Sequence, residues 1–274
     1  MTSERQLLFG MYMDPLRMEE AVERCRTAIG TRQRMLVGVL NAAKIVNLRR
    51  NSMLRNSLIE CDMIIADGQA VVWASKLLGR PLPERIAGID LFVRLLALAN
   101  AERRSVALLG ARPDVLAAME TAIRARYPNL TIAYSHHGYF KPEEAEGIAS
   151  RIRDCGADML FLGMVSPKKE IFLATHGPSL GVPVLHGVGG SFDILAGLTR
   201  RAPPLWQKFG MEWAYRVMQE PRRLWWRYLS TNSSFLHLLA REMLSPTRAF
   251  EHEDGQIVVK FERRETMPGS VVHD

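Results

Sequence analysis

Cysteine is scarce in this chain of 274 residues, and long apolar runs are missing from it. Its three cysteines, Cys25, Cys61 and Cys155, lie far apart without C-x-x-C spacing, which argues against a zinc site and a disulfide framework. No run approaches the ~18 apolar residues of a membrane-spanning helix. The first ten residues lack the basic start and apolar segment of a secretory signal, so we expect a cytoplasmic protein with reduced thiols.

The composition is that of an ordinary globular protein, with 47% hydrophobic and 24% charged residues. The net charge of +7 is compatible with a polyanionic partner. Most of the excess lies between residues 200 and 230, where seven Lys and Arg occur with two Glu. The same segment holds four of the five tryptophans, so it is expected to form a specialised surface.

Short apolar runs alternate with segments of helical spacing between residues 35 and 197. The predicted strands cover residues 35–40, 63–66, 105–109, 131–135, 159–162 and 182–185. This order predicts an α/β fold with a Rossmann-like, doubly wound, mainly parallel sheet. Right-handed crossovers place the turns after these strands at one edge, where Asn41, Asp67, Gly110, Ser166 and Gly189 would gather.

The pattern changes near residue 200. One helix is predicted there with Trp206, Phe209, Trp213 and Val217 on a single stripe, and Pro221 starts a second helix that ends near Met243. We therefore predict an α/β core of residues 1–200, a basic, Trp-rich helical appendage of residues 201–245 and a peripheral tail of residues 246–274. Two further strands are predicted, from Leu7 to Tyr12 and from Ile257 to Phe261.

Asp67 is the first candidate for chemistry. It follows a buried strand and precedes a helix, at the strand end where open α/β sheets bind their ligands. Position alone leaves helix capping as the more frequent role of such an Asp. Asn41 has the same placement after the preceding strand and either caps the next helix or contacts a ligand. The loop after Asp67 contains Arg80 and Arg85, which can place a cation beside the carboxylate.

The sequence GVGGSFD, from Gly187 to Asp193, is a glycine-rich turn between a strand and a helix. Such turns let a backbone approach a phosphate at a helix N-terminus. It is not G-x-G-x-x-G, which argues against nicotinamide binding. Asp193 either contacts a ligand or lies in the first helical turn. In SPKKE, Ser166 and Glu170 are typical of a capping box, whereas Lys168 and Lys169 can reach a phosphate.

The arginines and tryptophans between residues 206 and 227 allow three interpretations. They can form a nucleic-acid surface, a membrane surface with tryptophans at the headgroups, or a packed helical cap with a solvated basic side. Because the tryptophans share a stripe, core packing or membrane contact is favoured over base stacking. His136 and His137 have no Cys or carboxylate at ligand spacing, which argues against a metal.

Taken in order, these segments resemble the WecG/TagA/CpsF family of bacterial glycosyltransferases, family 26, over about residues 36–229. The similarity rests on Asn41-Ala42, ADG with Val71-Val72 and Ser75, LLGRPLPERIAGIDL, LLGARPDV, GVGGSFDILAGLTRRAP and EWAYRVMQEPRRLWWRYL. The resemblance implies an inverting, UDP-sugar-dependent hexosyltransferase without a firm metal requirement or cofactor. Its acceptor would be an undecaprenyl-diphosphate-linked saccharide at the cytoplasmic face of the plasma membrane. Known donors of the family include UDP-N-acetylmannosamine, its uronic acid and UDP-glucose.

The resemblance also assigns roles to residues. Asp67 matches the proposed general base, and Arg85 a functional arginine for the departing UDP or the acceptor diphosphate. The other matched positions contact substrate or membrane. They are Asn41, Gly68, Lys169, Gly189, Gly190 and Asp193 for substrate, and Arg216, Arg222, Arg223 and Arg227 for lipid or diphosphate. The resemblance implies either a monomer or a homo-oligomer.

Two positions depart from the family pattern. Lys169 stands where Gln is usual, which adds a cation and removes an acceptor, and Val39 stands where Thr is frequent. The donor sugar is therefore left open. We expect a peripheral-membrane enzyme of cell-surface polysaccharide synthesis that does not bind nucleic acid. A basic nucleic-acid-binding protein and a UDP-sugar enzyme with a soluble acceptor are the alternatives.

Overall fold

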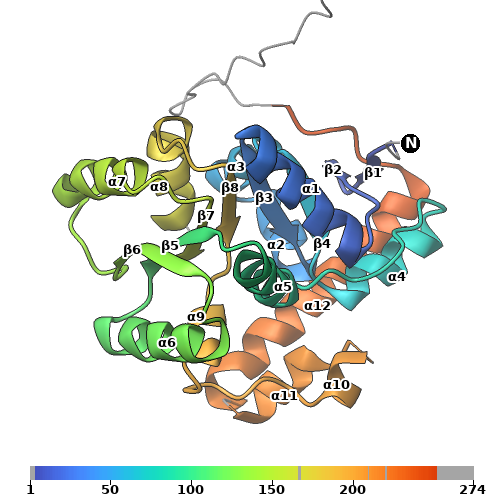
Figure 1. The fold of residues 1–274 in the computed structure, drawn as a ribbon. Coiled ribbons are helices and arrows are strands. Elements are labelled where there is room, and N and C mark those ends of the chain that lie inside the picture. The colour runs from blue at the N-terminus through green and yellow to red at the C-terminus, as the bar shows by residue number, and fades with distance from the viewer. Residues whose placement is uncertain (1–3, 166–167, 209, 220, 252–274) are drawn as a thin grey trace, which may run out of the picture.

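The six apolar runs of the core form one six-stranded parallel sheet (Figure 1). Its strands are β3 (Met35–Leu40), β4 (Met63–Ala66), β5 (Ser105–Gly110), β6 (Thr131–His136), β7 (Met159–Gly163) and β8 (Val184–Gly187). They lie in the order β4-β3-β8-β7-β5-β6, and each neighbouring pair is parallel. The structure is a computed structural model that describes residues 4–165, 168–208, 210–219 and 221–251. The predicted Rossmann-like α/β class is confirmed.

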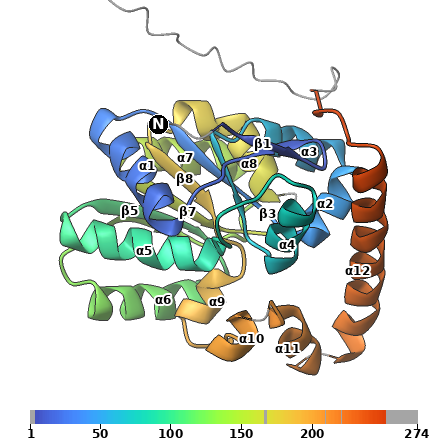
Figure 2. The ribbon, with the colours of Figure 1, turned by 90° about the vertical axis from the view of Figure 1, so that its right-hand side faces the viewer.

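Helices cover both sides of the sheet (Figures 1 and 2). One side carries α1 (Met18–Thr31), α5 (Gly88–Ala101), α6 (Pro113–Arg126) and α9 (Ser191–Leu195). The other carries α2 (Ala42–Leu48), α3 (Ser52–Ile59), α4 (Gln69–Leu77), α7 (Ala145–Asp154) and α8 (Lys168–His176). Two single turns, η1 (Pro142–Glu144) and η2 (Gly177–Ser179), adjoin α7 and α8.

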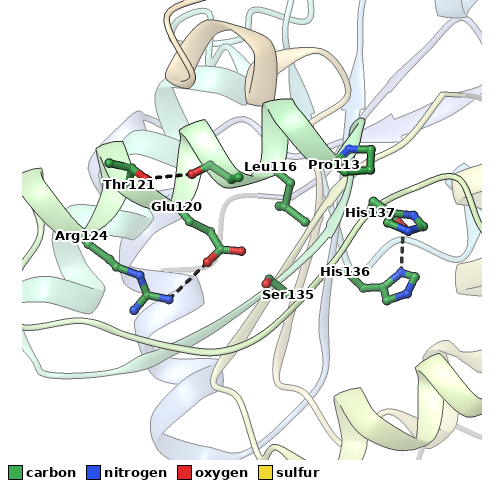
Figure 3. A pocket seen from close by; sticks show the side chains of 9 residues that line it. Pro113, Leu116, Glu120, Thr121, Arg124, Ser135, His136 and His137 are labelled. Atoms are coloured by element: carbon green, nitrogen blue, oxygen red, sulfur yellow. Dashed lines mark hydrogen bonds and ion pairs between the residues drawn. The ribbon is translucent and has the colours of Figure 1, made fainter.

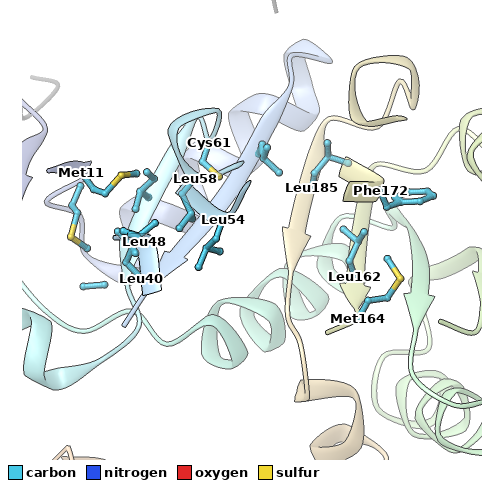
Figure 4. Close-up of a cluster of buried hydrophobic side chains, with 14 of the residues drawn as sticks. Met11, Leu40, Leu48, Leu54, Leu58, Cys61, Leu162, Met164, Phe172 and Leu185 are labelled. Atoms are coloured by element: carbon cyan, nitrogen blue, oxygen red, sulfur yellow. The ribbon is translucent and has the colours of Figure 1, made fainter. Parts of the chain in front are cut away.

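The continuous apolar strands follow from this double cover. Successive side chains of a strand point to opposite sides, so Leu36 joins the cluster under α2 and α3, whereas Val37 joins the cluster under α1 and α5. Figure 4 shows the first cluster, which includes Leu40 of β3 and Leu54 and Leu58 of α3. Because both sides are buried, no position in the central strands favours a polar residue unless that residue has a specific partner.

The predicted strand from Leu7 to Tyr12 is wrong, because two strands occupy this region. β1 (Gln6–Leu8) and β2 (Met11–Met13) form an antiparallel hairpin. Phe9 and Gly10, at its turn, have φ angles of 54° and 85°, and hairpin turns with two left-handed residues suit the twist of paired strands. Phe9 is an unusual residue for that conformation, which is why the sequence run looks continuous.

The chain continues beyond the sheet with α10 (Pro204–Lys208), α11 (Glu212–Gln219) and α12 (Pro221–Leu244). The single helix predicted across Trp206 and Val217 is wrong, because Gly210 separates α10 from α11 with φ 65°. A Cβ at Gly210 would lie 2.7 Å from Cβ of Gln69 in α4, so glycine permits this close approach. α12 packs along α2 at the side of the sheet (Figure 2).

The segment after α12 returns to the N-terminal hairpin. The backbone N–H of Phe250 donates to the carbonyl oxygen of Gly10 at 2.8 Å, and Arg49 in the loop after α2 donates to the hydroxyl of Thr247 at 2.9 Å. The start of the predicted tail is therefore packed on the core, while the run from Ile257 to Phe261 lies outside the described residues. The boundaries at residues 200 and 245 stay predictions.

All three cysteine thiols are free, as expected. Among the helices that the structure describes, none combines the length and the apolar character needed to cross a membrane.

Candidate active site

The ends of the neighbouring strands β3 and β4 bring Asn41 and Asp67 together. The side-chain amide of Asn41 lies 3.4 Å from Oδ2 of Asp67, a long hydrogen bond. Oδ1 of Asn41 also accepts from the backbone N–H of Lys44 at 3.0 Å and so caps α2. The capping role predicted for Asn41 is therefore confirmed, while the other end of its amide points to the carboxylate of Asp67. Its contact with a ligand stays a prediction.

Asp67 does not cap the helix that follows it. The N-cap of α4 is Gly68, and Oδ1 of Asp67 instead accepts from the backbone N–H of Gly88 at 2.9 Å. Gly88 is the first residue of α5, so the capping alternative for α4 is wrong and the carboxylate lies at the N-terminus of another helix. Among the residues that the structure describes, Oδ2 has only the long contact to Asn41, so it is the oxygen with the weaker hydrogen bonding.

Gly68 permits the two loops to meet. A Cβ at Gly68 would lie 3.3 Å from Cβ of Asn41, a tighter distance than most side chains accept. The backbone of Asp67 is also fixed, because its N–H donates to the carbonyl oxygen of Leu40 at 2.8 Å. The position of the carboxylate therefore follows from the pairing of β3 with β4.

The glycine-rich turn follows β8, the other neighbour of β3 in the sheet. Gly189 has φ 53°, Gly190 is the N-cap of α9, and Asp193 lies in the first turn of that helix, as one of its two interpretations predicted. The chain leaves β3 towards one side of the sheet and β8 towards the other. Open α/β sheets bind ligands at such a divergence, so this turn and Asn41 lie at the position where a sheet of this kind is expected to bind its ligand.

Lys169 lies over the end of β8. A Cβ at Gly187 would be 2.6 Å from Cδ of Lys169, so the lysine stem occupies the space that this glycine leaves open. Its Nζ is 3.3 Å from Oε1 of the buried Glu170. Lys168, by contrast, donates to backbone carbonyl oxygens of the loop after β6 at 2.7 and 2.9 Å and is a structural residue. Ser166, the expected partner in a capping box, lies outside the described residues.

Lys44 is a charged neighbour that the sequence patterns did not identify. Its Nζ donates to the carbonyl oxygen of Val39 at 2.9 Å, beneath the end of β3. Its pKa is lowered from 10.5 to about 8, chiefly by burial and then by the charge of Lys169, whereas Asp67 and Glu170 act in the opposite direction. In the sequence, only its position one helical turn after Asn41 indicates that Lys44 lies near the site.

Arg85 is nearly buried and has two acidic partners in this structure. Its guanidinium lies 3.2 Å from Glu212 of α11 and 3.8 Å from Asp90 of α5. Arg201 forms a bidentate pair with Asp90 and lies 3.6 Å from Glu212. The sequence patterns missed Arg201, Asp90 and Glu212, because the partners are up to 127 positions apart and no local pattern links them. Arg85 itself is followed by Ile86, whose N–H donates to the carbonyl oxygen of Ala66 at 2.9 Å, so the loop lies against the end of β4.

The appendage exposes aromatic residues together with Arg222. Trp225 and Trp226 in α12 are 59% and 74% exposed, so they do not form a packed cap, whereas Val217 in α11 is buried. The side chains of three other predicted lipid-binding residues, Arg216, Arg223 and Arg227, lie outside the described part of the structure.

A separate cavity of about 460 Å³ lies between α6 and the end of β6 (Figure 3). It is bordered by Glu120 and Arg124, which pair at 3.2 Å, and by His136 and His137. β6 and β4 are at opposite edges of the sheet, so this cavity is not the site of Asp67. In the described residues, no group of three or more His, Cys, Asp or Glu is arranged to hold a metal ion.

Comparisons with known proteins identify the relatives of this chain. The model of the Glycosyl transferase WecG/TagA/CpsF family matches residues 6–249. Two Staphylococcus aureus proteins, from strains MW2 and NCTC 8325 / PS 47, are each 35% identical over 219 residues, which cover 79% of this chain and 85% of each relative. Both are named N-acetylglucosaminyldiphosphoundecaprenol N-acetyl-beta-D-mannosaminyltransferase.

Proposed function

This chain belongs to the WecG/TagA/CpsF family of glycosyl transferases, and from that membership we propose that it moves a sugar from a UDP-sugar to a polyprenyl-diphosphate-linked saccharide in bacterial cell-surface polysaccharide synthesis. The observation that carries the proposal is the carboxylate of Asp67, fixed at the end of β4 by Gly88 with Oδ2 less engaged. N-acetylmannosamine is the first donor to test, because the Staphylococcus aureus relatives are named for it.

In this proposal Asp67 is the general base. An acceptor hydroxyl oxygen attacks the anomeric carbon while the bond from that carbon to UDP breaks, which inverts the configuration. The hydroxyl proton passes to Asp67, and UDP departs with the bonding electrons. Oδ2 is the oxygen assigned to the proton, since Oδ1 already accepts from Gly88. The amide of Asn41 would orient the same oxygen.

The departing UDP gains negative charge, which fixed donors and cations near it would stabilise. The turn at Gly189 and Gly190 and the ammonium of Lys169 lie around the end of β8, the strand next to β3, which leads to Asn41. Asp193 follows in the first turn of α9. We assign the donor diphosphate to this position and Arg85 to the acceptor diphosphate. Lys169, in place of the usual Gln, adds a positive charge where the UDP-sugar is expected to bind. Because this can change which sugar is accepted, the donor sugar is to be identified by assay.

Membrane contact is part of the proposal. The exposed Trp225 and Trp226 lie on the same helix as Arg222, a combination suited to an anionic lipid surface. The acceptor is a lipid, so a peripheral position on the inner face of the plasma membrane would present the active site to it. We also propose that transfer needs no metal ion. Lys169 and Arg85 would supply the positive charge that a metal ion supplies in metal-dependent transferases.

The test is UDP release from a panel of UDP-sugars, with and without a short-chain polyprenyl-diphosphate-linked N-acetylglucosamine in detergent. Acceptor-dependent release from one donor, unchanged by EDTA, supports the full proposal and identifies the sugar. Equal release with a soluble N-acetylglucosamine glycoside would favour an enzyme with a soluble acceptor. Absence of release from every donor by the folded protein would contradict the proposed activity.

A further inference from the structure

His186 is a polar residue in the middle of the sheet. It lies on β8 between Val37 of β3 and Phe161 of β7, and it is fully buried. Its ring meets the ring of Phe161 edge-on at 6.4 Å between centroids. Central parallel strands are ordinarily apolar, so a histidine here calls for a partner that an apolar side chain cannot supply.

That partner is the carbonyl oxygen of Gly88, 3.0 Å from Nε2 of His186. A carbonyl oxygen only accepts, so Nε2 carries the hydrogen and Nδ1 is unprotonated in the neutral ring. Burial lowers the pKa of His186 to about 4, which keeps the ring neutral near pH 7. Nδ1 is buried and has no hydrogen-bond partner in the described structure.

The unpaired Nδ1 lowers the stability of the folded protein, so filling space does not by itself explain a histidine here. An apolar residue of similar shape would occupy the same volume without leaving a buried acceptor unsatisfied. The bond from Nε2 to Gly88 is therefore the property that distinguishes His186 from an apolar residue at this position.

Gly88 connects His186 to the candidate base. Its carbonyl oxygen accepts from His186, and its N–H donates to Oδ1 of Asp67 at 2.9 Å. The preceding loop is tied to β4 through Ile86 and Ala66. The first residue of α5 is thus held on β8 by one hydrogen bond while it holds the carboxylate at the end of β4 by another.

We propose that His186 is a positioning residue for transfer: by holding Gly88 in place it keeps the N–H of Gly88 on Oδ1 of Asp67, so that Oδ2 is presented to the acceptor hydroxyl. This inference rests on the proposed function, in which Asp67 is the base. His186 itself contacts neither substrate nor the reacting atoms in this account.

Two substitutions separate positioning from packing. Gln places a donor near the position of Nε2, whereas Met has similar bulk and no donor. We expect His186→Gln to retain kcat within about threefold, and His186→Met to lose roughly tenfold in kcat, the scale of one hydrogen bond to a charged group. The KM for the UDP-sugar should change by less than about twofold in both variants, because neither substitution removes a contact with the UDP-sugar.

The pH profile gives the second measurement. In His186→Met the ionised carboxylate of Asp67 loses a well-placed donor, so the acid limb of the kcat profile should move to higher pH, and in His186→Gln it should stay at the wild-type position. Lys44 and Lys169, the cations that act on His186 together with Asp67, and Glu170, which acts on Lys44, are the same in both variants. The comparison therefore isolates the hydrogen-bond donor at position 186.

Circular dichroism melting first confirms that both variants are folded. Wild-type kcat and pH profile in His186→Met would overturn the inference, and so would equal losses in the Gln and Met variants, which indicate packing alone. Asp67→Asn is measured in parallel. Full turnover in Asp67→Asn would contradict the base assignment itself, an outcome distinct from any result at position 186.

Discussion

The carboxylate of Glu212 lies 3.2 Å from the guanidinium of Arg85, which joins the start of α11 to the loop beside Asp67. Oε1 of Glu212 is buried and has no hydrogen bond to any residue in the described part of the chain, and its ion pair to Arg201 is 3.6 Å long. Arg201 pairs much more closely with Asp90. Glu212 is therefore the loosely held member of this group of four charges, and an incoming diphosphate would compete with it for Arg85.

We expect Glu212→Gln to tighten UDP or acceptor-diphosphate binding by up to about fivefold, because it removes an internal competitor worth at most ~1 kcal/mol in a partly exposed ion pair. Competitive inhibition by UDP and the KM for the acceptor measure the effect, and they show which diphosphate Arg85 binds. Glu251→Gln, an exposed carboxylate outside this group, is the control. Weaker binding in Glu212→Gln would mean that Glu212 holds the appendage in its working position instead.

Asp67→Asn should lower kcat by roughly 10²-fold or more, the usual contribution of a general base. The amide can still accept from Gly88, so the fold should be preserved. Asp114→Asn, an exposed carboxylate at the start of α6, is the matched control and should leave kcat unchanged. Measured by acceptor-dependent UDP release, wild-type turnover in a folded Asp67→Asn protein would return Asp67 to a structural role at the start of α5.

The meeting of Asn41 and Asp67 could be predicted from sequence because it depends on local patterns and one general rule. Each residue follows an apolar run, and parallel strands end at the same edge of a sheet. The sequence did not indicate that Asp67 binds the start of α5 rather than α4. That outcome depends on the hydrogen bond from Ile86 to Ala66, which brings the loop carrying Arg85 back against β4. Local sequence patterns do not predict such a contact between distant segments.

Other features had no local signal at all. Phe9 adopts a left-handed conformation that its side chain does not favour, so the hairpin was read as one strand. Gly210 is compatible with a helix in sequence, and its φ of 65° together with its close approach to Gln69 explains the break. The pairing of Arg201 with Asp90 joins positions 111 residues apart. Each was decided by contacts between distant segments, which propensity and periodicity do not contain.

Two glycines should respond to alanine in opposite ways. Gly110 has φ 142°, and a Cβ there would lie 2.4 Å from the carbonyl carbon of Gly163, so Gly110→Ala should destabilise the protein by about 3 kcal/mol or more. Gly147 is an exposed residue within α7 with nothing near its Cβ position, so Gly147→Ala should stabilise by about 0.5–1 kcal/mol. Urea unfolding measures both. Equal changes in the free energy of unfolding would show that the close approach after β5 is not maintained in solution.

Replacing both exposed tryptophans of α12, in Trp225→Ser with Trp226→Ser, should weaken binding to phosphatidylglycerol vesicles by roughly tenfold or more, since burying such large side chains in the lipid interface contributes much of the affinity. UDP binding should be unchanged. Tyr12→Ser, which removes an exposed aromatic residue from the N-terminal hairpin, is the control for vesicle co-sedimentation. Equal losses in the control, or no loss in the double variant, would contradict membrane contact through α12.

Lys44 makes a prediction about stability and pH. Its pKa is about 8 in the folded protein, lowered from 10.5 chiefly by burial and then by Lys169. Between these values the unfolded chain holds a proton that the folded protein has released, so the contribution of Lys44 to stability rises with pH across this window. Lys44→Met removes the titration.

We therefore expect the free energy of unfolding of Lys44→Met, relative to wild type, to fall as the pH rises from about 8 to about 10.5, whatever the offset caused by losing the bond from Nζ to Val39. Urea unfolding at several pH values measures this slope, and Lys76→Met, at the exposed end of α4, supplies the comparison for removing a solvated lysine. Parallel curves for wild type and Lys44→Met would mean that Lys44 titrates as it does in the unfolded chain, and that its ammonium is hydrated rather than enclosed beneath the end of β3.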